Sequence, residues 1–468
     1  MGFGDGVGPA DCRKIKRRPN LLQRVMVRKL LAILFFQCIL CTAFATNYLT
    51  FTAEEDGSQF GIIRRGEANP DIQYSLDDGE SWTDLARDEI TLEKKGDKAL
   101  IRGNNPTGFS SYPDYSYFMM TGKIAASGSV MSLIDGKGET TTIPSTYCFY
   151  GLFYECASLT QAPELPATAM TLECYASMFE RCTGLTEAPE LPATTLEYAC
   201  YEKMFLDCTS LTQAPKLPAT TMKEYCYFCM FCNCTSLTQA PELPATTMDV
   251  CCYKSMFCNC TSLTQAPKLP ATTMDDHCYY YMFWGCTSLT KAPELPATTL
   301  AYGCYENMFL DCTSLTQAPE LIATELVDHC YYYMFSGCTN LSKIKVRFVE
   351  WETFSTLAWV ANVASTGTFY CLEELPIEYG ASEIPIGWNV KHVWDDDAVE
   401  DIANANTRVW TDGLNLYVRY AGDVEVYGLN GKQIYKGHGD VDSPMCLSMP
   451  AHGVYVVKMG GKVSKVEL

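Results

Sequence analysis

Histidine and the residue patterns of common catalytic sites are scarce in this sequence of 468 residues. It contains five histidines, no glycine-rich phosphate loop and no G-x-S-x-G nucleophile motif. Glu294 and Glu320 occupy the same position of successive repeats, as residues on a solvated edge do. Glycoside hydrolysis needs a pair of carboxylates, and no pair of acidic residues departs from the repeat pattern to provide one. We therefore predict that the protein is not an enzyme and holds no cofactor.

Positive charge is also in short supply, with 35 Lys and Arg against 55 Asp and Glu and a net charge of −20. Residues 1–45 carry eight of the basic and two of the acidic residues, so the rest of the chain has 27 basic and 53 acidic residues. Nucleic acids and anionic membranes both repel an acidic surface. The composition therefore argues against nucleic acid as a partner.

Long apolar runs are missing after residue 45, where no segment approaches the 18 residues of a membrane-spanning helix. Before that point, basic residues lead into an apolar run from Leu30 to Leu40 and a small-x-small site ending at Ala45, which together predict a signal peptide in residues 1–45. The true start could be Met26. A retained anchor and a lipoprotein attached at Cys41 are alternatives, although bulky Leu40 disfavours lipidation. We expect an exported protein, at the cell surface or outer membrane or outside the cell, with its oligomeric state open.

The sequence does contain a 26-residue repeat, present in eight copies between Cys148 and about Leu341; we call its recurring residue pattern the phrase. Its clearest copy runs from Cys304 to Leu321, and its two cysteines, eight residues apart, return in every copy without a slip. A unit of this length cannot bury its apolar face alone, so neighbouring units must stack. We predict a solenoid of eight repeats over residues 146–345.

The spacing inside the phrase predicts a short amphipathic helix followed by an extended run. Leu300, Cys304, Met308 and Cys312 fall at steps of four, as on one stripe of a helix. The apolar run after the second cysteine holds prolines in most copies, which remove main-chain donors and limit any strand to a few residues. The predicted fold class is therefore α+β, with several domains.

The pattern F-x-x-C-x-x-L, leading into an apolar run and a proline, resembles the BspA-like class of leucine-rich repeats known from surface proteins of Bacteroidetes. The resemblance covers roughly residues 145–345. It implies a leucine-rich-repeat-like solenoid that adheres to a protein or glycan ligand on host or neighbouring cells. Two features depart from the family's pattern: the repeat is a few residues longer, and cysteine stands where isoleucine is more common.

The segments on either side of the repeats have their own signatures. Residues 46–145 alternate apolar and polar residues in short pieces and predict a β-sandwich-like domain. Within them, Ser75 to Trp82 resembles the Asp-box of sialidases, S-x-D-x-G-x-x-W, and a single copy indicates a braced turn and not a glycosidase. Residues 346–395 predict a cap for the last repeat, and residues 396–407 predict an acidic linker. The cap is rich in large aromatic side chains: Trp351, Phe354, Trp359 and Trp388.

Residues 408–468 predict a small β domain, with two-residue hairpin turns at Asn430-Gly431 and Gly460-Gly461. The segment from Met449 to Lys458 resembles the C-terminal sorting domains of proteins secreted by Bacteroidetes. This resemblance implies export across the outer membrane and attachment to the surface. A plain structural module is the alternative.

Cysteine is abundant, with 22 residues after position 45, of which 16 belong to the repeats. A bridge within one repeat would need the helix to end before the second cysteine, because residues eight apart on a helix are about 12 Å apart and bridged Cα atoms lie within about 7 Å. We expect buried thiols, which pack as small apolar side chains, and keep regular disulfides as the alternative. The residues concerned are Cys148, Cys156, Cys174, Cys182, Cys200, Cys208, Cys226, Cys234, Cys252, Cys260, Cys278, Cys286, Cys304, Cys312, Cys330 and Cys338.

Two further observations concern possible bridges and metals. Cys232 and Cys258 occupy the same slot of adjacent repeats and could bridge if those slots face each other. His277 and His329 each precede a repeat cysteine but lie two repeats apart, so we predict no shared metal site.

The variable positions of the repeat indicate a binding surface. The two residues after C-Y and the two after M-F change from copy to copy and should project away from the core stripe. Aromatic side chains, which often anchor interfaces, gather there toward the end of the array. We predict a ligand-binding patch bordered by Tyr280, Tyr281, Trp284, Tyr332 and Tyr333. Two alternatives stay open: these side chains pack on the cap, or the solenoid is a spacer that displays a ligand-binding N-terminal domain.

Overall fold

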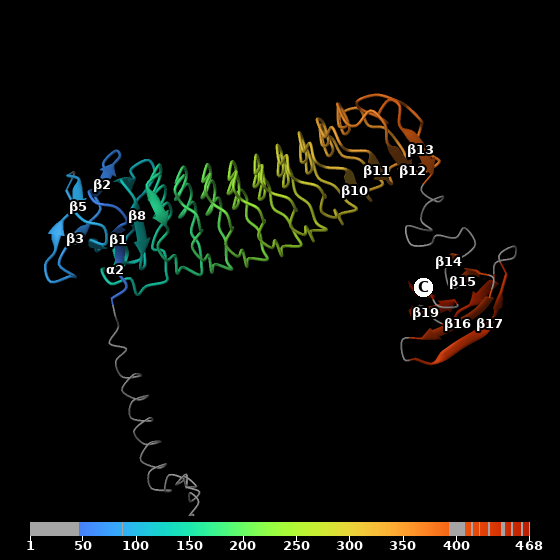
Figure 1. Ribbon diagram of the computed structural model, residues 1–468, viewed down its shortest axis with the longest axis horizontal. Coiled ribbons are helices and arrows are strands. Elements are labelled where there is room, and N and C mark those ends of the chain that lie inside the picture. Colours follow the sequence, from blue (N-terminus) through green and yellow to red (C-terminus); the bar gives the residue numbers. More distant parts are fainter. Residues whose placement is uncertain are drawn as a thin grey trace, which may run out of the picture.

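The computed structural model describes residues 46–86, 88–392 and 408–467, the last range with short gaps at 413–414, 421, 429–430, 441–444, 451–452 and 460–461. These residues form a mostly-β protein with N-terminal sheets, a solenoid and two small C-terminal sheets (Figure 1). Among them the one α-helix is α2 (Ser132–Asp135), so the helical part of the predicted α+β class is wrong. The predicted signal peptide and the linker at 396–407 lie outside the described residues.

The N-terminal part forms two sheets whose apolar faces meet. The larger sheet has the order β4-β3-β6-β1-β8-β9 and the smaller one β5-β2-β7. Phe51 in the larger sheet contacts Phe60 and Phe118 in the smaller, with ring centroids 5.2 and 4.9 Å apart. The strands are β1 (Leu49–Ala53), β2 (Ser58–Arg64), β3 (Gln73–Ser75), β4 (Thr83–Asp84), β5 (Ile90–Leu92), β6 (Lys98–Arg102), β7 (Ser116–Thr121), β8 (Ile124–Ser127) and, from the first repeat, β9 (Leu159–Gln161).

The Asp-box segment is a turn held by its own side chains. The Asp77 carboxylate accepts hydrogen bonds from the Ser75 hydroxyl, 2.6 Å away, and from the main-chain N–H of Ser81, 2.9 Å away. Trp82 packs beside this turn against Tyr48, with ring centroids 5.0 Å apart. The interpretation of the motif as a structural turn is confirmed.

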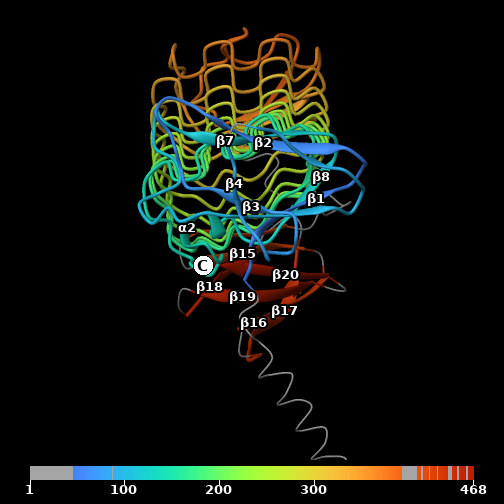
Figure 2. The ribbon, with the colours of Figure 1, turned by 90° about the vertical axis from the view of Figure 1, so that its left-hand side faces the viewer.

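Residues 145–392 wind into an elongated solenoid whose coils stack along one axis, starting beside the N-terminal sheets (Figures 1 and 2). Main-chain hydrogen bonds join the coils: Tyr305 N–H donates to the Cys330 carbonyl over 3.1 Å, and Phe309 N–H to the Met334 carbonyl over 2.9 Å. Between these donors, Met308 N–H donates within its own coil to the Tyr305 carbonyl over 3.2 Å. In this segment every second N–H therefore holds two coils together.

The segment predicted as an amphipathic helix is a series of four-residue turns. The residue before the first cysteine and those four and eight positions later take positive φ in each repeat; in the seventh they are Gly303, Asn307 and Asp311, at 57°, 56° and 59°. An α-helix needs negative φ throughout, so the helix prediction is wrong. The inward stripe is still present, with Cys304 and Met308 fully buried, because each four-residue turn brings the same side of the chain back to the core.

The first six repeats carry a second proline in the sequence L-P-A-T, such as Pro296 in the sixth repeat. Within residues 172–392, all of which the structure describes, regular parallel strands occur only after this proline is lost. Copies that keep L-P-A-T meet on this side through isolated bridges, such as that between Glu187 and Gln213. The seventh repeat has Ile322 in place of this proline. The eighth repeat has neither proline, with Lys345 and Phe348 at the two positions, so it offers main-chain N–H groups that a proline lacks. The four strands of the resulting sheet are β10 (Gln317–Leu321), β11 (Lys343–Val346), β12 (Thr368–Cys371) and β13 (Asn389–His392).

Columns of identical side chains fill the solenoid. Tyrosine rings stack from Tyr175 to Tyr331 with centroids 5.7–6.1 Å apart. Phenylalanine rings stack from Phe153 to Phe335 at 5.4–5.7 Å. The same buried cluster continues into the N-terminal sheets and the last coils. One hydrophobic core therefore runs through residues 49–388.

The aromatic segment after the eighth repeat continues the solenoid with coils that lack the cysteine phrase. Phe335 N–H donates to the Trp359 carbonyl over 2.8 Å, and the fully buried Trp359 ring packs 6.1 Å from that of Phe335. Trp388 is also buried, and its indole N–H donates to the Ala364 carbonyl over 2.7 Å. Phe354, in contrast, is 58% exposed. Trp359 and Trp388 thus close the core, whereas Phe354 faces outward.

Residues 408–467 form two small sheets with a core of their own, which includes Leu416, Val426 and Val457. The sheet orders are β14-β15-β18 and β17-β16-β19-β20. The two expected hairpin pairs, β16 with β17 and β19 with β20, are antiparallel; Asn430, Gly460 and Gly461 lie outside the described residues. The strands are β14 (Arg408–Asp412), β15 (Asn415–Arg419), β16 (Gly422–Gly428), β17 (Gln433–Gly439), β18 (Met445–Ser448), β19 (Val454–Met459) and β20 (Lys462–Glu467).

Candidate functional site

The four-residue turns divide each repeat into pairs of residues that face the core and pairs that lie toward solvent. In the sixth repeat Met282 and Phe283 are fully buried, whereas Tyr281 and Trp284 on either side are half-buried. Inter-coil hydrogen bonds keep the slots in register, as where Asn259 N–H donates to the Trp284 carbonyl over 2.6 Å. Variable side chains of successive repeats therefore form columns along the outside of the solenoid.

The five predicted aromatic residues lie in these columns as two groups. In the sixth repeat, the Tyr281 ring lies 4.3 Å from that of Tyr280 and 5.0 Å from that of Trp284, measured between centroids. In the eighth repeat, the Tyr332 and Tyr333 rings lie 4.7 Å apart. All five side chains are half-buried.

Three further side chains join the two groups into one surface. His277 and His329 directly precede the first cysteine of the sixth and eighth repeats, and Tyr302 lies two residues before that of the seventh. The Tyr302 ring lies 5.0 Å from that of His277 and 5.1 Å from that of His329. His277 contacts Tyr280 at 5.3 Å, and His329 contacts Tyr332 at 4.9 Å. We call the eight residues the aromatic strip: His277, Tyr280, Tyr281, Trp284, Tyr302, His329, Tyr332 and Tyr333.

The strip is open to solvent in its middle and continues toward the capping coils. Tyr302 is 39% exposed. Phe354, on the next coil, lies 6.3 Å from His329 and extends the apolar surface. At this end the strip meets the coils after the eighth repeat through the His329–Phe354 pair.

Sequence reasoning missed His277, Tyr302 and His329 as parts of this surface. It considered the two histidines only as metal ligands, and their separation by two repeats excluded a shared site. Tyr302, in the repeat between them, is what brings them into one strip. The available signal was the recurrence of aromatic side chains one or two positions before the first cysteine, as at Tyr225 and Tyr198 in earlier repeats.

Charged and polar groups border the strip. The Lys254 ammonium lies 4.8 Å from the Tyr280 ring centroid, and the Trp284 indole N–H donates to the Asp311 carboxylate over 3.3 Å. A Glu306 carboxylate oxygen lies 3.8 Å from His277 Nε2. Burial raises the pKa of Glu306 to about 7, although Lys254 opposes this shift, and burial lowers the pKa of His277. Near neutral pH the ring faces of the strip therefore lie beside a partly protonated Glu306 and a mostly neutral His277, together with the Lys254 ammonium and the Asp311 carboxylate.

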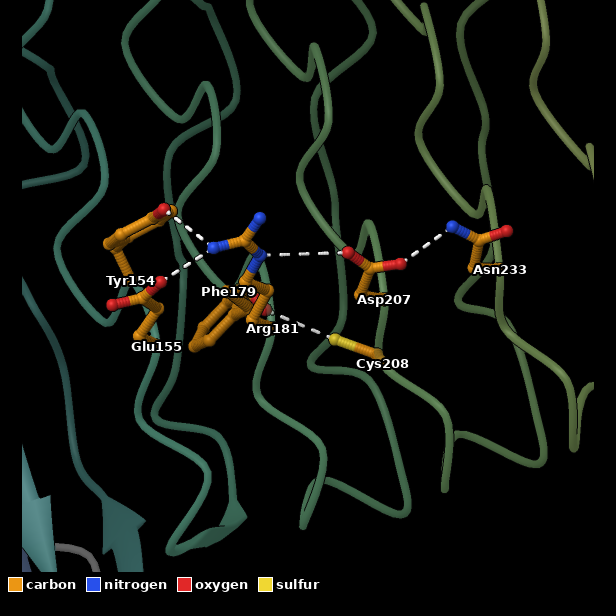
Figure 3. Close-up of polar contacts among 7 residues, drawn as sticks. All are labelled: Tyr154, Glu155, Phe179, Arg181, Asp207, Cys208 and Asn233. Atoms are coloured by element: carbon orange, nitrogen blue, oxygen red, sulfur yellow. Dashed lines mark hydrogen bonds and ion pairs between the residues drawn. The ribbon is translucent and has the colours of Figure 1, made fainter.

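A second column, on the N-terminal repeats, is polar. Arg181 donates to the Glu155 carboxylate over 2.6 Å and lies 3.7 Å from Asp207, whose carboxylate accepts a 2.6 Å hydrogen bond from Asn233 (Figure 3). Asn259 extends the column with a 2.9 Å bond to Asn233. Exposed ion pairs such as that of Arg181 with Glu155 contribute little stability individually. The column is a polar, hydrogen-bonded edge, whereas the aromatic strip presents large ring faces.

Hollows in the surface lie elsewhere. An open hollow of about 700 Å³ in the N-terminal sheets is lined by residues that include Glu67, Asn69, Asp71 and Asp84. It is the natural location of a ligand if the N-terminal part does the binding.

The sixteen repeat cysteines are buried free thiols in the structure. The second cysteine of each repeat donates a hydrogen bond to a main-chain carbonyl oxygen, as Cys208 does to Phe179 over 3.1 Å (Figure 3). Burial raises the pKa of these thiols, which opposes nucleophilic chemistry. Among the residues that the structure describes, no group of three or more His, Cys, Asp or Glu is arranged to hold a metal ion.

Comparisons of the chain with protein-family models, with curated proteins and with solved structures return no match. No helix of the described residues has the length and apolar character needed to cross a bilayer.

Proposed function

We propose that this protein is a non-enzymatic recognition protein of the cell surface or extracellular space, and that its solenoid binds a protein or glycan ligand through the aromatic strip. The observation that carries the proposal is the unbroken ring-to-ring contact of eight side chains over three adjacent repeats.

Tyrosine, tryptophan and histidine suit this role because each offers a flat apolar face together with a polar edge. Side chains of this kind supply most of the binding energy in many interfaces. The strip residues sit on main chain that is hydrogen-bonded to the coils on both sides, as where Tyr281 N–H donates to the Glu306 carbonyl over 3.0 Å and Ser255 N–H to the Tyr280 carbonyl over 2.8 Å. A surface held in this way loses little conformational entropy on binding.

The proposal includes the family and the location. The cysteine phrase resembles BspA-like leucine-rich repeats, and the C-terminal β module resembles a sorting domain; both resemblances support an adhesin exported to the surface. Deleting residues 408–468 tests the location. We expect the shortened protein to be lost from the cell surface, as measured by protease accessibility on whole cells, while unchanged surface exposure would exclude a sorting role for the module.

A second candidate is that the solenoid is a spacer and that the hollow beside Asn69 binds the ligand. The N-terminal sheets share one core with the solenoid, so cutting them off would expose apolar side chains. Point substitutions on an otherwise intact chain are therefore the appropriate way to separate the two candidates.

The experiment screens residues 46–468 against a glycan array and a panel of matrix proteins, and then tests three variants on the ligand found. Replacing Tyr280 and Trp284 together with serine should lower capture at least tenfold, which corresponds to roughly 1.4 kcal/mol. The matched control replaces Tyr112, which is 60% exposed at the N-terminal end, with serine and should bind normally. Replacing Glu67 and Asn69 with alanine tests the hollow.

The three variants distinguish the candidates when circular dichroism shows that each is folded. Loss of capture in the Tyr280/Trp284 variant alone supports the aromatic strip. Loss in the Glu67/Asn69 variant alone excludes the strip and supports the spacer role.

A further inference from the structure

The fourth and fifth repeats carry cysteines on their outer side that are not part of the repeat phrase. Cys229, Cys232 and Cys258 occupy variable slots, where other repeats have residues such as Ser177, Leu206 or Tyr281. We call these three residues the outer thiol cluster. Cys229 is half-buried, and Cys232 and Cys258 are 9% and 4% exposed, whereas Cys226, Cys234, Cys252 and Cys260 of the same repeats are fully buried.

Cys229 and Cys232 are the ends of one four-residue turn. Cys232 N–H donates to the Cys229 carbonyl over 3.2 Å, and residues joined in this way have Cα atoms less than about 7 Å apart. This limit includes the Cα separations of about 4.4–6.8 Å that are found across disulfides.

Cys232 and Cys258 hold the same slot on successive coils. Asp207 N–H donates to the Cys232 carbonyl over 2.9 Å, and Asn233 N–H donates to the Cys258 carbonyl over 2.8 Å, so the coils are in register here. Hydrogen-bonded extended chains lie about 4.8 Å apart, well within the Cα separation of about 4.4–6.8 Å found across disulfides. The two slots therefore face each other.

The three thiols also affect one another's pKa values. A hydrogen bond with Cys232, together with burial, raises the pKa of Cys229. A hydrogen bond with Cys229 lowers the pKa of Cys232, but a hydrogen bond with Cys258 and burial outweigh this effect and raise that pKa to about 12. Cys232 is thus the central member of a row of three thiols. The second repeat cysteines differ, because their thiols point at carbonyl oxygens, as those of Cys234 and Cys260 do toward Phe205 and Phe231.

We propose that the outer thiol cluster is a redox site in which Cys232 forms a disulfide with Cys258 across two coils, with Cys229 as the alternative partner of Cys232. Formation needs a disulfide oxidant, such as oxidised glutathione or a dithiol-disulfide oxidoreductase. Because the pKa of Cys232 is raised, only its small thiolate fraction reacts: it slowly attacks one sulfur of the oxidant, forms a mixed disulfide and expels one thiolate. The Cys258 thiolate then attacks the Cys232 sulfur and expels the second thiolate. Two protein thiols are oxidised, one oxidant disulfide is reduced to two thiols, and the two protein protons end on the released thiolates.

Cys229 gives the site a second state. Its thiolate can attack Cys232 in the bridged form, which releases Cys258 as a thiolate and leaves a Cys229–Cys232 disulfide within one turn. This exchange conserves the number of disulfides and converts a link between two coils into a link inside one coil. The proposal is independent of the aromatic strip as a ligand site.

The test uses the full-length protein, reduced and then equilibrated in glutathione buffers that range from fully reduced to fully oxidised. After acid quenching and alkylation under denaturing conditions, trypsin cuts after Lys223, Lys254 and Lys268, so a Cys232–Cys258 bridge links peptides 224–254 and 255–268. We expect the linked pair to be absent in the reduced buffer and to become the main form of these peptides in the oxidised one. Tandem mass spectra assign the bridged cysteines.

Variants define the role of each thiol. Cys232→Ser should abolish both bridges, and the slot tolerates serine because Ser336 occupies it in the eighth repeat. Cys258→Ser should leave only the Cys229–Cys232 form. Cys251→Ser is the matched control: its thiol is also on the outer side but hydrogen-bonds Tyr225, so the link should form as in the wild type. Absence of the linked peptides in the oxidised wild type, or their persistence in a folded Cys232→Ser protein, would overturn the proposal.

Discussion

The thiol of Cys208 donates a hydrogen bond to the main-chain carbonyl oxygen of Phe179 over 3.1 Å, across 29 positions of the chain. The same oxygen accepts the N–H of Cys182 over 3.0 Å, so one carbonyl joins two coils. Equivalent thiol bonds of 3.0–3.2 Å run from the second repeat to the eighth. This position needs a small apolar side chain with one donor, and cysteine meets all three requirements.

Cys208→Ala should therefore destabilise the solenoid. The substitution removes the sulfur from a fully buried site, leaves a small cavity and withdraws one donor from the Phe179 carbonyl. We expect a loss of about 1–2 kcal/mol in the free energy of unfolding, measured by urea denaturation. The exposed Cys446 supplies the control, since Cys446→Ala should leave unfolding unchanged. Identical midpoints for the two variants would show that the thiol bond and its packing contribute nothing.

Phe257 lies in the middle of the phenylalanine column, 5.7 Å from both Phe231 and Phe283, and is fully buried. Phe257→Ala removes one ring from this stack and should cost about 3–5 kcal/mol. Lys254→Ala, three residues away, should cost less than about 1 kcal/mol because its half-buried side chain lies outside the core and its ammonium makes cation–π contacts with Phe228 and Tyr280. Thermal unfolding of both variants checks the difference, and equal midpoints would contradict the placement of Phe257 in the core.

Thiol titration separates buried thiols from regular disulfides. In residues 46–468 purified without any reductant, a thiol reagent added under native conditions should label at most the six cysteines outside the repeat phrase. The sixteen repeat cysteines should react only after denaturation, with no reductant present. If the repeat cysteines still failed to react with the reagent in denaturant, or if mass spectrometry found a Cys304–Cys312 link, regular disulfides would instead be established. The six other residues are Cys229, Cys232, Cys251, Cys258, Cys371 and Cys446.

Stability should fall as pH rises through the range in which Glu306 ionises. Its pKa is about 7 in the folded protein against an ordinary value of 4.5, so between these values the folded state binds more protons than the unfolded state. Stability from this group is complete below about pH 4.5 and is lost as pH rises through about 7. Relative to Glu306→Gln, the wild type should lose about 1–3 kcal/mol over this window. A pH-independent difference between the two proteins would contradict the buried carboxyl.

The comparison with Glu306→Gln is needed because His277 titrates nearby with the opposite sign. Burial lowers its folded pKa, so its contribution to stability is complete above the ordinary value of 6.5 and is lost as pH falls from there through the lowered folded pKa. The histidine is present in both proteins, so the difference between them reports Glu306. Urea midpoints at half-unit steps from pH 4.5 to 8 provide the measurement.

The period and the core positions of the solenoid could be predicted because they depend on apolar spacing alone. Cys304, Met308 and Cys312 are buried as expected. The conformation of that segment could not be derived from the same spacing, since a helix and a series of four-residue turns both bring every fourth residue inward. The distinguishing signal was the residue just before the second cysteine of each repeat, such as Asp311 before Cys312. In six of eight copies it is Gly, Asn or Asp. These are the residues that adopt positive φ most readily.

The candidate surface was predicted in part for the same reason. Variable slots identified the outward columns, which placed Tyr281 and Trp284 on the surface. Contacts between repeats depend on how coils align, and this alignment was not known from one repeat. Tyr302 illustrates the limit. It belongs to the strip because its ring contacts those of His277 and His329, which lie 25 and 27 residues away in the sequence. A search for local motifs does not connect residues so far apart.

The hydrogen bonds between coils are directed from one coil to the next, which has a mechanical consequence for a chain held at one end and loaded at the other. A pull along the stack acts on all bonds of one coil boundary together, but on successive boundaries in series. We therefore expect the stack to yield coil by coil and to act as an extensible tether. Each 26-residue coil should add roughly 90 Å of length when released, since a residue spans at most about 3.5 Å. Single-molecule stretching would record this as a train of equal steps, whereas one large rupture would show that the coils fail as a unit.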